Sequence, residues 1–150
     1  MKKIAKIEVE VIPDYDADLS YLGTFDAEPK GEHAIEHEPN DPSTHNWFNC
    51  QTGMEEYAQR EYERMLAYDR GEWGMVGVKA VAEIQISDDG KNWLCNEVAS
   101  GGLWGIENDG GEDYIKEVGR DQVSDLRETL LELGFTAKEI GAVEVIEIEL

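Results

Sequence analysis

An unbroken alternation of apolar and polar residues near the middle of the chain places the strongest constraint on its fold. Across GMVGVKAVAEIQIS, residues 74–87, every second position is apolar, at Val76, Val78, Ala80, Ala82, Ile84 and Ile86. This is the period of a β-strand that buries one face. The turn residues DDGKN follow, so WLCNEVAS is expected to return beside the first strand as a hairpin.

The two ends of the sequence also have strand character. KIAKIEVEVIP carries Ala5, Ile7, Val9 and Val11 on one face, and Pro13 ends the pattern. The final GAVEVIEIEL shifts its alternation by one residue, as a bulge or a strand covered on both faces would require. Either strand could be a sheet edge, and an exposed edge can pair two subunits, so a homodimer remains open.

Two segments have the helical period instead. Residues 52–70 place four apolar side chains on one side and end at Gly71. In the stretch 112–135, Val123, Leu126, Leu130 and Leu133 have helical spacing before Gly134, and a separate short turn ending near Gly119 is an alternative for its first part. The resulting order of elements favours an α+β fold, with a mainly antiparallel sheet of about four to five strands and two helices packed on one face. At 150 residues the chain is expected to form a single α+β domain.

The segment 14–50 lacks any sustained period and is expected to be a long, acidic and irregular excursion, with room for one short strand at NWFNC. The face of the sheet opposite the helices is expected to be polar and acidic. Its candidate residues are Glu8, Glu10, Glu83, Glu147 and Glu149.

Net charge is the outlying property of the composition. The 34 acidic residues exceed the 13 basic ones by 21, and such a surface repels nucleic-acid phosphates and anionic membranes. Nucleic acids and anionic membranes are therefore not expected as direct partners. The expected partners are cationic proteins. The acids gather in residues 13–50 and 121–150, so two acidic patches are more consistent with the sequence than a uniform coat.

Neither a secretory leader nor a membrane span is predicted. The longest apolar run is shorter than 18 residues, and the start lacks an apolar h-region, so a cytoplasmic protein is expected. Cys50 and Cys95 form no CxxC pair and are interpreted as reduced thiols without an assigned role.

The glycine-rich stretch SGGLWGIENDGGEDY, residues 100–114, first suggests a phosphate loop. It matches neither GxxxxGK[ST] nor GxGxxG, and it contains no Lys or Arg. Its acids would surround a phosphate with like charge. The alternative that stays open is a sensor module in which loop 101–111 closes over a small ligand or cation. Trp104, between Leu103 and Ile106, is expected to be structural and to fill a core edge, with its indole N–H bonded to backbone.

Metal and catalytic motifs are incomplete. DYDADLSYLGTF has acids at three EF-hand positions but Leu19 where glycine is required. His33, His37 and His45 precede Cys50 without zinc-ligand spacing, and no serine lies in GxSxG. The sequence therefore predicts no metal, no cofactor, no catalytic residue and no enzyme.

The acids themselves favour binding to another protein. Outward residues two apart on a strand, or three to four apart on a helix, lie about 5–7 Å apart, similar to successive phosphates on a nucleic-acid strand. Such a surface can occupy the basic groove of a nucleic-acid-binding protein, although a merely solubilising surface is an equal alternative. The candidate partner-binding residues are Asp14, Asp16, Asp18, Glu107, Asp109, Glu112, Asp113, Glu147 and Glu149.

Several stretches, most specifically RGEW at residues 70–73 and SGGLWGIE at residues 100–107, resemble a family of small acidic hypothetical proteins of bacteriophages, prophages and other mobile elements. The resemblance covers about Asp14 to Phe135 and carries over no functional residue. It implies expression in a bacterial host cytoplasm. It also implies an inhibitor of a host nuclease or defence effector, of the anti-restriction or anti-CRISPR type, by analogy.

Overall fold

The computed structural model describes residues 1–37 and 46–148. Contacts within the chain divide it into two compact units, one formed by Met1–Tyr15 with Met75–Leu150, the other by Asp16–Gly74. The sequence was interpreted as one domain.

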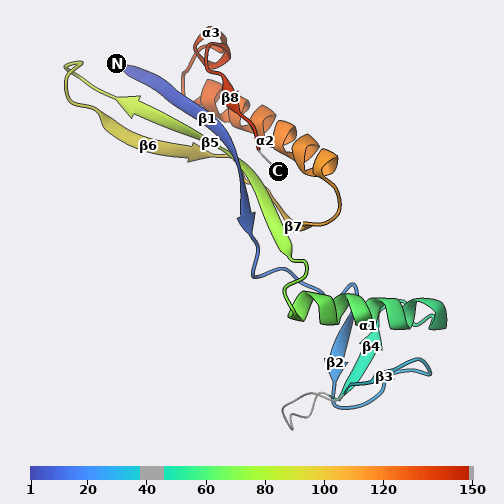
Figure 1. Ribbon diagram of the computed structural model, residues 1–150. Coiled ribbons are helices and arrows are strands. Elements are labelled where there is room, and N and C mark those ends of the chain that lie inside the picture. The colour runs from blue at the N-terminus through green and yellow to red at the C-terminus, as the bar shows by residue number, and fades with distance from the viewer. Residues whose placement is uncertain (38–45, 149–150) are drawn as a thin grey trace. The chain divides into compact units, whose positions relative to one another are not determined.

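The first unit contains a five-stranded sheet. Its strands are β1 (Lys2–Pro13), β5 (Met75–Ile86), β6 (Leu94–Ala99), β7 (Leu103–Glu107) and β8 (Val145–Ile146). β1 and β5 lie side by side through its centre (Figure 1). β6 and β7 both pair with β5, one after the other along the same strand, and β8 pairs with β1 at the opposite edge.

Most strand pairs are antiparallel, as expected, and only β1 with β8 is parallel. The buried face expected for β5 is confirmed at Val78, Ala80 and Ala82, which are fully buried, but Ile86 is exposed and Val81 on the opposite face is buried as well. One register shift between Ile4 and Lys6 alters the pattern of β1. Ala5, expected on the buried face, is consequently exposed, and Ile4 packs against the core.

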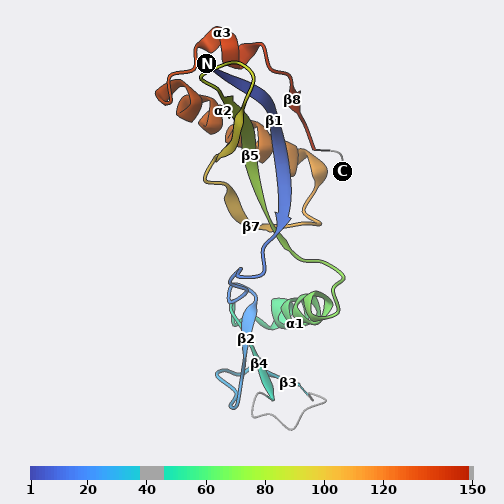
Figure 2. The same ribbon diagram turned by 90° about the vertical axis from the view of Figure 1, so that its left-hand side faces the viewer.

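Helix α2 (Glu112–Glu132) runs along one face of this sheet (Figure 2). Its apolar side packs on the sheet in two clusters, one around Leu126 and Leu130, the other around Ile115 and Val118. Gly119 permits a close approach, since a Cβ there would lie 3.0 Å from a methyl carbon of Val9.

A short helix that the sequence did not predict, α3 (Ala137–Gly141), follows α2. Thr136 and Glu139 form a capping box at its start, in which each side chain accepts a hydrogen bond from the other residue's backbone N–H. The terminal strand is correspondingly shorter than the sequence suggested, because α3 and the turn after it take up part of that segment.

The second unit contains a three-stranded antiparallel sheet and helix α1 (Glu55–Asp69). The strands are β2 (Gly23–Asp26), β3 (Ile35–Glu36) and β4 (Trp47–Cys50), in the order β2-β4-β3. Segment 14–50 is therefore not irregular throughout. The strand at NWFNC is confirmed as β4, and two further short strands pair with it.

Aromatic side chains form the interior of this unit. Phe48 of β4 is fully buried, and its ring lies 5.2 Å from that of Phe25 and 5.4 Å from that of Tyr62 on α1. The α+β class is thus confirmed, but the two expected helices are divided. α2 packs on the five-stranded sheet, whereas α1 packs on this smaller one.

Two sequence expectations fall outside the described residues, namely those on His45 and Glu149. Among the residues that are described, no helix is both long enough and apolar enough to cross a membrane.

Candidate functional site

The solvent side of α2 carries an almost continuous row of carboxylates. The row, called the acidic ridge below, consists of Asp113, Glu117, Asp121, Asp125, Glu128 and Glu132. All six side chains are exposed. Successive members are three or four residues apart, so they lie on one side of the helix about 5–6 Å from one another. From end to end the ridge is about 28 Å long.

The basic residues of α2 are separated from this ridge. Lys116, Arg120 and Arg127 also follow one another at helical spacing, but on the flank between the ridge and the buried side. Asp113 and Glu117 each have a basic residue three positions further on, whereas the other four members have only like charges at three- and four-residue spacing. Each like-charge pair destabilises a helix by a few tenths of a kcal/mol, so the ridge as a whole costs about 1 kcal/mol.

The sequence singled out only the beginning of this ridge. Glu112 and Asp113 do form the first turn of α2, where negative charge interacts favourably with the helix dipole. The remaining five acids were missed because residues 112–133 were read for their apolar positions. Their regular spacing of three and four residues was the available signal.

Three other candidate acids are associated with the glycine loop that precedes α2. Asp14 accepts a hydrogen bond from the backbone N–H of Gly105 at 2.9 Å, which joins the end of β1 to the glycine loop. Glu107 ends β7, and Asp109 lies in the turn before α2. The carboxylate of Asp14 therefore helps to hold the glycine loop in place.

The remaining candidates lie on other segments of the chain. Asp16 and Asp18 belong to the second unit. The backbone N–H of Ser20 donates to Asp18 at 2.8 Å, and this bond lowers the pKa of the carboxyl group. Glu147 follows β8 and is exposed. Of the nine acids proposed from the sequence, Glu112 and Asp113 share the first turn of α2.

The glycine loop uses its backbone donors internally. The Gly102 N–H donates to the side-chain oxygen of buried Gln122 on α2 at 2.9 Å, and Gly110 donates to the Glu107 carbonyl. Together with the Gly105 bond to Asp14, three glycine amides of the loop already have protein acceptors. A phosphate nest needs such amides to be free.

Trp104 confirms one expectation and corrects another. Its indole N–H donates to the Gly101 carbonyl at 3.1 Å, as expected. The ring, however, does not fill the core edge beside Ile106. It is 46% exposed and lies on Gly77 of β5, so closely that a Cβ at residue 77 would overlap it. A shallow hollow of about 340 Å³ lies beside it.

The sheet face opposite α2 is less acidic than expected. Glu8 and Glu10 of β1 and Glu83 of β5 do lie there, but Lys6 is 3.0 Å from Glu8 and Lys79 is 3.8 Å from Glu10. These pairs offset part of the negative charge. The exposed acids of α2 are therefore the more strongly negative surface of the first unit.

His33 and His37 are the histidines of the second unit that the structure describes. His37 lies with its Nδ1 2.7 Å from the hydroxyl of Tyr62, inside the aromatic cluster. Burial raises the pKa of that tyrosine. Across residues 1–37 and 46–148, no three His, Cys, Asp or Glu side chains are grouped as metal ligands.

No protein-family model, curated protein or solved structure matches this chain. Its function is therefore inferred from the geometry and charge of the molecule.

Proposed function

We propose that this chain is a non-enzymatic acidic protein that binds a cationic, nucleic-acid-binding protein through the acidic ridge of α2. The observation that carries the proposal is the row of six exposed carboxylates on one side of a well-packed helix. A row that costs stability through self-repulsion is expected to be retained where a partner neutralises it.

The ridge resembles a nucleic-acid strand in charge and dimensions. Its carboxylates follow one another with a rise of about 6 Å, and its length of about 28 Å corresponds to roughly eight base pairs of duplex. The helix is anchored by its buried side, including Leu126 and Leu130 at zero exposure. A rigid row of this kind can enter a basic groove without paying for the ordering of a flexible chain.

The setting proposed for this activity is the cytoplasm of a phage-infected bacterium, following the resemblance to small acidic phage proteins. There the partner would be a host nuclease or defence effector, and occupation of its basic groove would exclude its DNA. The net charge of −21 supports rapid, electrostatically steered association with such a protein.

The proposal is tested by comparing two variants of equal charge. The ridge variant neutralises four members of the row with near-isosteric amides: Glu117→Gln, Asp121→Asn, Asp125→Asn and Glu128→Gln. The control variant neutralises four exposed acids of the second unit: Glu28→Gln, Glu32→Gln, Glu36→Gln and Glu63→Gln. Both carry the same net charge, so only the position of the carboxylates differs.

Each protein is immobilised and used to capture partners from phage-infected bacteria, with duplex DNA added as competitor. We expect the wild type and the control variant to capture the same cationic protein, DNA to displace it, and the ridge variant to lose it. Equal capture by the two variants would show that position on α2 is irrelevant. Capture that DNA does not reduce would exclude mimicry of a nucleic acid.

A further inference from the structure

A groove with a basic rim lies between α2 and the C-terminal strand. Its volume is about 460 Å³, within the range usual for small-molecule sites. α2 provides one wall, and β1 and the segment around β8 provide the other. The residues that line it are Val9, Lys116, Gly119, Arg120, Val123, Arg127, Val143, Val145, Glu147 and Ile148.

The floor of this groove is aliphatic and only partly covered. Val9, Val143, Val145 and Ile148 pack against the buried clusters, yet each remains half-buried. Gly119 adds no side chain above them. Apolar surface is thus available to a ligand at the bottom of the groove, and covering it would be favourable.

The rim supplies positive charge. Lys116, Arg120 and Arg127 all line the groove from the same flank of α2. Within residues 1–37 and 46–148, none of the three forms an ion pair with a carboxylate. Glu147 is the single acidic residue in the lining. These three basic side chains therefore line one groove together in a chain with 34 acids and 13 bases.

We propose that this groove binds a small amphipathic monoanion, with its carboxylate between the basic side chains and its hydrocarbon tail on the valine floor. Charge-assisted hydrogen bonds from Arg120 and Arg127 would hold the carboxylate. The adjacent ridge and the strongly negative net charge disfavour polyanions, which must carry several charges into that field, more than a single carboxylate. The site lies on a different flank of α2 from the ridge and does not depend on the ridge binding a partner.

The test uses octanoate as the probe, with 1-octanol and acetate as the matched ligands that lack the charge or the tail. Binding to the full chain is followed by NMR, through the methyl groups of Val123, Val143 and Val145. We expect octanoate to shift these signals saturably, and both octanol and acetate to bind at least tenfold more weakly. Equal binding of octanoate and octanol would overturn the role of the basic rim.

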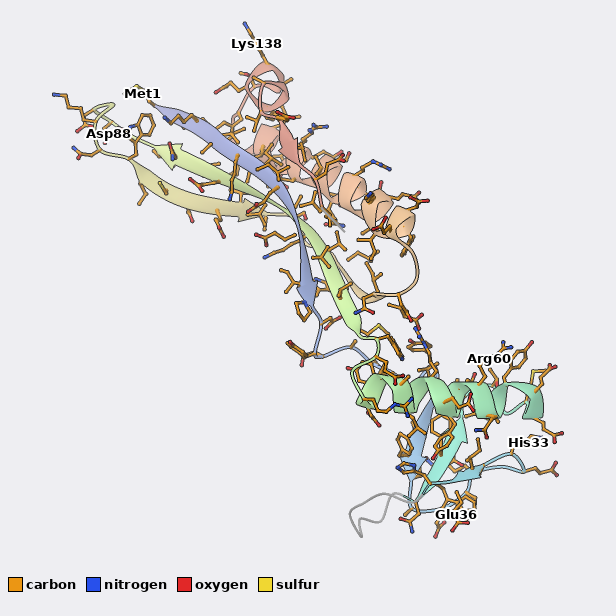
Figure 3. All side chains as sticks on the ribbon, viewed as in Figure 1. Met1, His33, Glu36, Arg60, Asp88 and Lys138 are labelled. Carbon is orange, nitrogen blue, oxygen red and sulfur yellow. The ribbon has the colours of Figure 1, made fainter. Side chains whose placement is uncertain are left out.

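Variants then locate the site. Arg120→Gln with Arg127→Gln should weaken octanoate binding at least tenfold, and because both side chains are exposed the fold should persist. Lys138→Gln, on α3 and pointing into solvent (Figure 3), should leave it unchanged. A chain that ends at Ile148 should bind octanoate with the same affinity as the full chain, because the lining residues of the groove extend no further than Ile148. Unaltered affinity in the double variant, or methyl shifts only outside the groove, would refute the assignment.

Discussion

The close contact between Gly77 and Trp104 predicts that Gly77→Ala changes the free energy of unfolding in opposite directions when the indole ring is present and when it is removed. A Cβ at residue 77 would overlap the indole ring, so Gly77→Ala must push Trp104 away from the sheet. A tryptophan can bury up to about 250 Å², and Trp104 is 46% exposed. Roughly 130 Å² are thus covered, worth at most about 3 kcal/mol at about 25 cal/mol per Å².

We therefore expect Gly77→Ala to lower the free energy of unfolding of the first unit by about 2 kcal/mol. In a Trp104→Ala background the clash is absent. Alanine is favoured over glycine inside a strand by about 0.5–1 kcal/mol, so the same substitution should then stabilise. The two changes should be coupled by about 2–3 kcal/mol.

Urea unfolding followed through amide signals of β1 and β5 reports on the first unit alone. The wild type, both single variants and the double variant complete the cycle. Additive effects, or the same loss on Gly77→Ala in both backgrounds, would show that the indole ring does not rest on this glycine.

Three further predictions concern hydrogen bonds made by side chains. Thr136→Ala should destabilise the first unit by about 1 kcal/mol in urea because it removes the capping box of α3, and Thr136→Ser should restore most of it. Gln122→Leu should cost about 1–3 kcal/mol and speed hydrogen exchange at Gly102, whose N–H would lose its acceptor. Hydrogen bonds from Thr24 and Asn49 lower the pKa of Asp26 from 3.8 to about 2. This carboxylate therefore stabilises the second unit above pH 4 and ceases to do so as the pH falls toward 2, and Asp26→Asn should flatten that part of an acid titration followed by near-UV circular dichroism.

The elements with long, regular patterns were predictable from the sequence. β5 alternates without interruption, and both long helices keep their apolar positions at three- and four-residue spacing. These patterns suffice because each element buries one continuous face. The α+β class followed from their order.

Short strands and local irregularities were not predictable in the same way. β2 and β3 contain four and two residues and are fixed by pairing with β4 and by the aromatic cluster around Phe48. That cluster gives residues 16–74 an interior of their own, which the absence of a sequence period concealed. The register shift at Ala5 was likewise not predicted from the alternation of residues in β1.

The candidate acids of the site were named from the sequence, and they belong to both units. Glu112 and Asp113 form the first turn of α2, as their place before the helical pattern suggested. The position of Trp104 on Gly77 joins residues 27 apart, and no local pattern links them. The grouping of Lys116, Arg120 and Arg127 on one flank of α2 was not predicted, because the net charge of the chain says nothing about where individual basic residues lie.

The salt dependence of partner binding tests the central claim most directly. The affinity of the captured partner is measured from 50 to 500 mM salt for the wild type, the ridge variant and the control variant. Binding through the acidic ridge predicts that the wild-type affinity falls steeply and that the slope against salt is shallower for the ridge variant but not for the control. An affinity that stays flat across this range, or slopes that coincide for all three proteins, would contradict it.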